Sequence, residues 1–166
     1  MASKAAPATI DATDLRLLEA LQADAGLTNQ ELAERVGLSP SPCLRRVKAL
    51  EESGVIEKRV AVLGRPALGL TLTAFIQISM DRHTPDRFER FEKTVKRYPE
   101  VLACHMITGQ QADYLLMVVV PGMEAYQSFL LERLTRIEGV SGVHSSFVMR
   151  TVVETTALPL GYVSPP

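Results

Sequence analysis

The sequence predicts an α+β chain in which a helical part comes first and a part that alternates strands with helices follows. Between 11 and 54, apolar residues recur at helical spacing, and turn residues divide the pattern into three short helices. From 72 to 153, apolar runs typical of strands are separated by two amphipathic stretches. The breakers of GRPALGL, at 64–70, indicate a linker between the two parts. We therefore expect domains at 11–63 and 71–153, with tails at 1–10 and 154–166.

The composition is that of a folded chain with no unusual charge. Hydrophobic residues make up 46% of the 166 residues, enough for a packed core, and the net charge is −1. Any affinity for nucleic acid must therefore come from a local patch. Two cysteines, Cys43 and Cys104, are too few for a disulfide framework or a metal cluster. No stretch has the apolar length of a signal peptide or a membrane span, so we expect a cytoplasmic protein.

The residues from 28 to 54 predict two short helices joined by a tight turn. Thr28 and Glu31 have the spacing of a capping box, and Gly37 can end that helix with a positive φ. Ser39 is a good N-cap for the next helix, with proline directly after it, and Gly54 ends that helix. The helix that begins at Asp11 and ends at Gly26 is expected to support the pair.

The second of these helices carries cations and no acid between 39 and 49. Such a pair is typical of a helix-turn-helix, whose second helix enters the major groove by its N-terminal end. Arg45 is our candidate for a bidentate contact to guanine, and Arg46 and Lys48 are candidates for phosphate contacts. The predicted DNA-binding residues are Ser39, Ser41, Pro42, Arg45, Arg46 and Lys48. An ordinary helical hairpin with a solvated basic face is the alternative.

The segment VIEKRVAVL, at 55–63, is rich in β-branched residues and predicts a strand or hairpin arm beside the helices, that is, a winged helix-turn-helix. Lys58 and Arg59 in this arm either contact the DNA backbone or are solvated charges that protect a strand edge.

The second domain follows the order strand, helix, strand, strand, helix, strand. This order is that of the ferredoxin-like βαββαβ unit, an antiparallel sheet with helices on one face. Its uncovered apolar face predicts self-association. The expected elements are 72–80, 85–97, 101–107, 113–120, 123–137 and 140–153.

The sequence contains little that indicates catalysis. We find no phosphate-binding glycine loop, metal-ligand spacing or nucleophile elbow, so we expect no catalytic residue, metal or cofactor. The polar loop from Thr108 to Asp113 is more informative, because Gly109, the glutamines and Asp113 would suit the ends of an amino acid. A plain polar hairpin turn is an equally good interpretation.

Three motifs in order resemble the Lrp/AsnC (leucine-responsive/asparagine regulator) family of transcription factors. They are LTNQELAERVGLSPSPCLRRVKALEESGVI at 27–56, CHMITG with DYLL at 104–116, and VPGMEAY at 120–126. The resemblance implies a sequence-specific DNA-binding regulator, not an enzyme, whose assembly or DNA affinity responds to an amino acid. It also implies a homodimer, often assembled as four dimers, with the effector bound between dimers.

By position, the resemblance and the loop chemistry together assign an effector site. Its residues are Met106, Thr108, Gly109, Gln110, Asp113, Met123, Phe147 and Met149. Three residues separate Gly109 from Asp113, whereas the family commonly has two.

Two other functions share this architecture. A tetrapyrrole decarboxylase of haem biosynthesis would need histidines such as His105 and His144 to converge on substrate acid groups. A chromosome-organising protein would share the DNA mechanism but have a lower specificity ratio.

Overall fold

The computed structural model describes residues 9–109 and 112–163. These residues divide into two compact units. The first comprises the described residues up to Val62 together with those from Val153 onward, and the second runs from Leu63 to Val152. The expected tail at 1–10 lies almost wholly outside the described residues.

The first unit is built on three helices: α1 (Ala12–Ala23), α2 (Asn29–Val36) and α3 (Pro40–Glu52). Their apolar stripes meet in one core, as the helical spacing predicts. This core comprises Leu17, Ala20, Leu21, Leu32, Ala33, Val36, Cys43 and Val47. α1 ends at Ala23, earlier than Gly26, because the backbone of Asp24 is extended.

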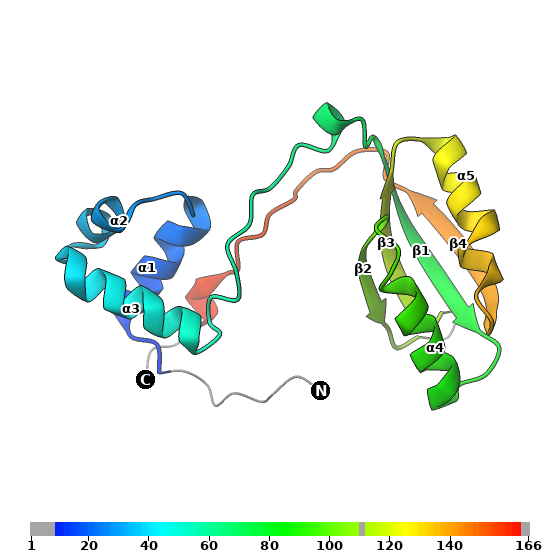
Figure 1. Cartoon of the computed structure of the whole chain (residues 1–166), viewed down its shortest axis with the longest axis horizontal. Helices are drawn as coiled ribbons and strands as arrows, with labels where there is room; N and C mark the ends of the chain where they lie inside the picture. The colour runs from blue at the N-terminus through cyan, green and yellow to red at the C-terminus, as the bar shows by residue number, and fades with distance from the viewer. Residues whose placement is uncertain (1–8, 110–111, 164–166) are drawn as a thin grey trace. The chain divides into compact units, whose positions relative to one another are not determined.

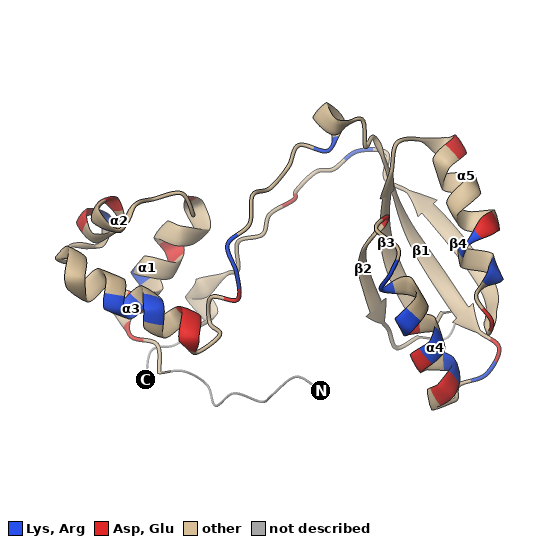
Figure 2. Ribbon diagram, in the orientation of Figure 1, with Lys and Arg blue, Asp and Glu red and all other residues tan. Residues whose placement is uncertain are grey.

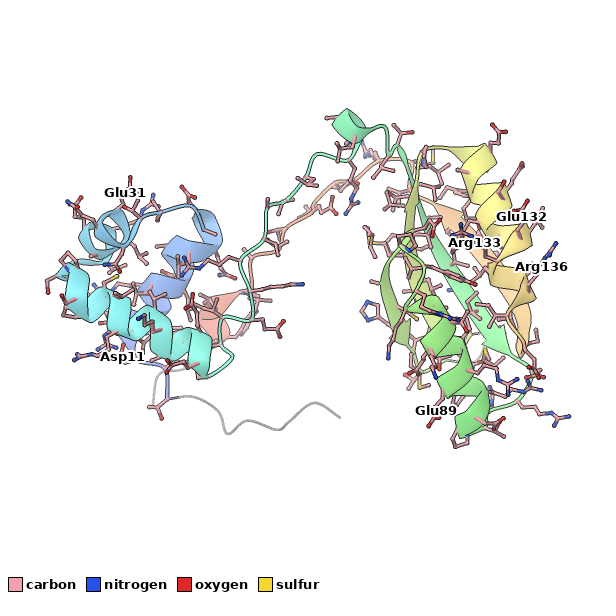
Figure 3. All side chains as sticks on the ribbon, viewed as in Figure 1. Asp11, Glu31, Glu89, Glu132, Arg133 and Arg136 are labelled. Atoms are coloured by element: carbon pink, nitrogen blue, oxygen red, sulfur yellow. The ribbon has the colours of Figure 1, made fainter. Side chains whose placement is uncertain are left out.

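Local sequence signals set the ends of these helices. Thr28 and Glu31 form the predicted capping box, in which the Glu31 carboxylate accepts from the backbone N–H of Thr28 at 2.8 Å. Glu31 is labelled in Figure 3 at the first turn of α2. Gly37 ends α2 with φ 71°, and Gly54 follows α3 with φ 76°. Both glycines therefore adopt the left-handed conformation that side chains disfavour.

The expected strand at 55–63 is wrong for the single chain. Residues 57–64 are exposed and form no strand. A strand requires a hydrogen-bonded partner, and none of the described residues pairs with this segment in a sheet.

The C-terminal segment returns to the helical unit. The side chain of Gln22 on α1 accepts from the backbone N–H of Leu158 at 2.5 Å and donates to its carbonyl at 3.2 Å. A short 3-10 helix, Leu160–Tyr162, follows. Residues 154–163, expected as a tail, thus have a hydrogen-bonded place beside α1.

The second unit has the predicted order of elements. These are β1 (Leu72–Met80), α4 (Pro85–Val95), β2 (Val101–Met106), β3 (Tyr114–Val120), α5 (Met123–Glu132) and β4 (Val140–Phe147). The strands are ordered β2-β3-β1-β4, and every pair is antiparallel. Figure 1 shows α4 and α5 on the same side of this sheet. The predicted ferredoxin-like fold is confirmed.

The core of this unit lies between the sheet and its helices. Alternate residues of β1, among them Ala74, Ile76 and Ile78, are fully buried against Phe91 of α4 and Phe129 of α5. On the other side of the sheet, Phe75 is 39% exposed. The described residues therefore leave Phe75 on this face of the sheet partly exposed.

Four elements of this unit end earlier than predicted: α4 and β2 by one or two residues, and β4 and α5 by more. β4 ends at Phe147 rather than Val153, because Phe147 pairs with Ala74 and only one further bond, from Val148 N–H to the Thr73 carbonyl, remains before β1 begins. α5 ends at Glu132, and a 3-10 turn at Leu134–Arg136 completes the expected helix to 137. No helix among the described residues is long and apolar enough to cross a membrane.

Candidate nucleic-acid interface and effector site

α3 buries one face and presents the other to solvent. Cys43, Val47 and Leu50 are buried, whereas Arg45 and Lys48 are exposed on the remaining surface. Figure 2 shows that the cations of α3 are followed by acidic residues only at its C-terminal end. The cations of α3 therefore lie in its middle, and the first turn adds the positive end of the helix dipole.

Ser39 occupies the N-cap position of α3, but its side chain makes no capping hydrogen bond. An N-cap oxygen accepts from the second or third helical N–H, and Pro42 at the third position has no N–H to donate. Asn29 supplies an alternative anchor, since its side-chain amide donates to the Pro40 carbonyl at 2.8 Å. The hydroxyls of Ser39 and Ser41 lie on exposed residues.

Arg46 differs from its two basic neighbours. One of its nitrogens, Nη1, lies 2.7 Å from an Asp11 oxygen and 2.8 Å from an Asp14 oxygen. The side chain of Asp14 is only 12% exposed, and that of Arg46 is 34% exposed. Asp11, labelled in Figure 3, is also the N-cap of α1. Arg46 therefore ties α3 to the start of α1.

The ionisation of this cluster follows from its contacts. The Asp14 backbone N–H, and then the Arg46 guanidinium, lower the pKa of the Asp11 carboxyl below its usual 3.8. Asp14, and then Asp11, raise the pKa of Arg46. Arg46 contacts both carboxylates, so the three side chains form a network rather than a single surface pair.

The two cations of the expected wing have separate surroundings. Arg59 pairs with Glu51 at the end of α3 at 3.0 Å, and Lys58 is exposed.

The candidate effector residues form two groups in the sheet unit. Met106, Thr108, Gly109 and Asp113 lie at the end of the sheet where β2 turns into β3. Met123, Phe147 and Met149 lie at the opposite end, where β3 stops and β4 leaves β1. Gln110 lies outside the described residues. Because β3 has seven residues, the groups are roughly 20 Å apart within one chain.

Each group exposes side chains that suit a ligand. Met106 is 56% exposed and Met149 is 99% exposed. A Cβ added to Gly109 would meet no atom within 4 Å, so there is open space beside its backbone. Phe147 packs edge-on against Tyr126 of α5, with ring centroids 5.0 Å apart. Asp113 already has protein partners, Met80 and His83.

The histidines needed for the enzyme alternative do not converge. In the sheet register His105 is opposite Leu115, Gln77 is opposite Leu115, and His144 is opposite Gln77. His105 and His144 are therefore on the two edge strands, separated by three strand spacings, or roughly 14 Å.

Other reactive groups show no catalytic arrangement. Burial raises the pKa of the Cys104 thiol to about 11, which keeps it protonated and unreactive. Within 9–109 and 112–163, no group of three His, Cys, Asp or Glu side chains could hold a metal ion.

Several of these contacts were not predicted from the sequence. The spacing of Cys43, Arg46 and Leu50 is i, i+3, i+7, which places Arg46 beside the buried stripe and could have indicated an internal partner. The contacts of Asn29 and His83 join segments distant in sequence, and no local pattern indicates them.

Comparisons with known proteins agree with this geometry. A family model described as the Lrp/AsnC ligand binding domain matches residues 73–158, and one described as winged helix-turn-helix DNA-binding matches residues 10–57. The Bkd operon transcriptional regulator of Pseudomonas aeruginosa is 41% identical over 92% of this chain and 99% of its own. The leucine-responsive regulatory protein of Escherichia coli is 40% identical over 90% of each.

Solved structures give the same result. A transcriptional regulator of Neisseria meningitidis, crystallised as a complex with L-methionine, has a TM-score of 0.90 and 44% identity, covering 94% of this chain and all of the other. An AsnC family regulator of Agrobacterium tumefaciens has a TM-score of 0.88 and 39% identity, covering 93% and 100%.

Proposed function

The chain belongs to the Lrp/AsnC family of transcriptional regulators, and from this membership we propose how its own residues bind DNA and an effector. It is a DNA-binding regulator with an amino-acid-binding domain, and its relatives are regulators rather than enzymes. The tetrapyrrole decarboxylase alternative therefore has no support, in agreement with the separation of His105 and His144.

The exposed basic surface of α3 carries the proposal for DNA. Arg45 reads a guanine, Lys48 contacts phosphate, and Ser39 and Ser41 at the helix start contact phosphate or base edges. Pro42 contributes shape at the same turn. Arg46, because Asp11 and Asp14 already hold it, sets the position of α3 rather than contacting phosphate.

Arg45→Ala tests the base contact. We expect it to weaken binding to a site selected from a random duplex pool by about 1–3 kcal/mol and to relax specificity at one base pair. Lys48→Ala is the matched control, since loss of a phosphate contact weakens all sequences alike and lowers the salt slope by about one. Mobility-shift titration measures both, and unchanged affinity of the Arg45→Ala protein would remove the assignment. The ratio of selected to random DNA in the same assay separates a specific regulator from a chromosome-organising protein.

We propose that the effector is an amino acid bound at Met106, Thr108, Gly109, Gln110, Asp113, Met123, Phe147 and Met149. Support comes from the open space at Gly109 and the exposed methionines at both ends of the sheet. L-Methionine and L-leucine are the first ligands to titrate. One similar structure is a complex with L-methionine, and one relative is named leucine-responsive regulatory protein. Isothermal titration should show binding of at least one standard amino acid, and no heat with any of the twenty would refute the proposal.

We propose further that copies of the chain pair through the uncovered face of the sheet and that dimers assemble into a tetramer of dimers. Phe75 and Leu102 are exposed in the single chain, and burial of such a face stabilises a dimer. Light scattering with and without the effector measures the mass, and a monomer at micromolar concentration would contradict the pairing.

A further inference from the structure

Asp113 joins three segments at one end of the sheet. Its carboxylate Oδ2 accepts from the backbone N–H of Met80, the last residue of β1, at 2.7 Å. Its own backbone N–H donates to the Ile78 carbonyl at 2.8 Å, and its carbonyl accepts from the Ile107 N–H at 2.9 Å. The side chain is only 20% exposed. Asp113 is therefore an internal anchor between these segments.

His83 completes this anchor from the connection between β1 and α4. Its Nε2 lies 2.8 Å from Asp113 Oδ1, and its ring stacks on Phe88 of α4, with centroids 6.0 Å apart and planes at 25°. A carboxylate accepts hydrogen bonds, and an imidazole nitrogen that bears hydrogen can donate one. Phe88 holds the ring on one side, and Nε2 lies in polar contact with the carboxylate.

We propose that His83 is a positioning residue of the effector site. By donating to Oδ1, His83 sets the orientation of the Asp113 carboxylate. Asp113 in turn holds the segments around Ile107 and Tyr114 in place. The candidate effector residues Met106 and Thr108 extend from these segments. An effector ammonium would then meet a carboxylate that is already oriented, which lowers the entropy lost on binding. This role rests on the proposed effector function, but the anchor itself does not.

Two substitutions separate the hydrogen bond from the ring packing. His83→Phe keeps a ring against Phe88 and removes the donor, whereas His83→Gln keeps a side-chain N–H and removes the ring. Arg82→Ala, in the same connection, is the control for a general disturbance of the loop.

The first measurement is hydrogen exchange of the full ligand-free protein. We expect His83→Phe to speed exchange at the Met80 and Ile107 amides by roughly 2- to 10-fold, the range for one lost hydrogen bond. His83→Gln should remain close to wild type, as should Arg82→Ala. Exchange in His83→Phe equal to wild type, or equally fast in His83→Gln, would overturn the anchor.

The second measurement is calorimetric affinity for L-methionine. We expect His83→Phe to weaken binding by roughly 2- to 10-fold and His83→Gln to restore it. Faster exchange with unchanged affinity would overturn the positioning role. If wild type binds no amino acid, the effector function fails, and the positioning role fails with it, while the exchange measurement still decides the anchor.

Discussion

Arg46 is a cation on the proposed DNA-binding helix, but its contacts within the chain are those of a structural residue. The guanidinium lies between two carboxylates of α1, one of them largely buried. Removing it would leave the largely buried side chain of Asp14 without this partner, which is costly for a buried polar group.

We therefore expect Arg46→Ala to lower the free energy of unfolding by about 1 kcal/mol, the upper range for a partly exposed ion pair. Urea unfolding measures the change, and Arg45→Ala, on the exposed surface, is the control, with a change below about 0.5 kcal/mol. Unchanged stability combined with a loss of DNA affinity like that of Lys48→Ala would instead assign Arg46 to phosphate.

The same cluster predicts a pH dependence. The pKa of Asp11 is lowered by the Asp14 backbone N–H and by Arg46, so its contribution is present above the usual 3.8 and is lost as pH falls through the lower folded value. Asp11→Asn should therefore be less stable than wild type at neutral pH and lose less stability below pH 3.8. Thermal unfolding at pH 7 and at successively lower pH measures this, and parallel curves would contradict it.

At the scale of elements, the starts of α2 and α3 look alike in sequence but differ in structure. Thr28 caps α2 through a reciprocal pair with Glu31, whereas Ser39 starts α3 without a side-chain cap. Pro42 contributes to the difference, because it removes one of the two backbone N–H groups from which an N-cap oxygen accepts.

Thr28→Ala should therefore lower the free energy of unfolding by about 1 kcal/mol, and Ser39→Ala should change it by only a few tenths. The expected order reverses for DNA affinity, since Ser39 is a proposed DNA contact. Chemical denaturation and mobility shift on the same two proteins check both expectations. An equal loss of stability in the two variants would show that Ser39 does cap α3.

At the scale of the whole molecule, the candidate effector residues occupy opposite ends of one sheet. A ligand the size of an amino acid cannot contact both groups in a single chain when they are roughly 20 Å apart. If both groups bind one effector, they must come from different copies, which fits the proposed assembly of dimers.

Mixing two inactive variants tests this arrangement. Thr108→Arg and Met149→Arg should each abolish L-methionine binding, because a bulky charge fills one half of the site. When the two variants are co-refolded in equal amounts, half of the copies have an unaltered Thr108 and half have an unaltered Met149. If each site joins these two halves from different copies, about a quarter of the wild-type sites should be regained. Isothermal titration counts the sites, and no recovery in the mixture would place the whole site in one chain.

The sequence by itself determined the order of elements, the two-part organisation and the exposed basic face of α3. These follow from signals that neighbouring residues carry: helical spacing, strand alternation, and caps such as Thr28 and Gly37. Its local patterns also carry the resemblance to the family.

Only the tertiary structure decided the partners of Arg46, the place of Asp113 beside His83, and the absence of a strand at 57–64. Each depends on segments far apart in the chain. An arginine on a helix has the same propensity whether its partner is phosphate or Asp14, and a β-branched segment becomes a strand only where another segment offers its hydrogen bonds.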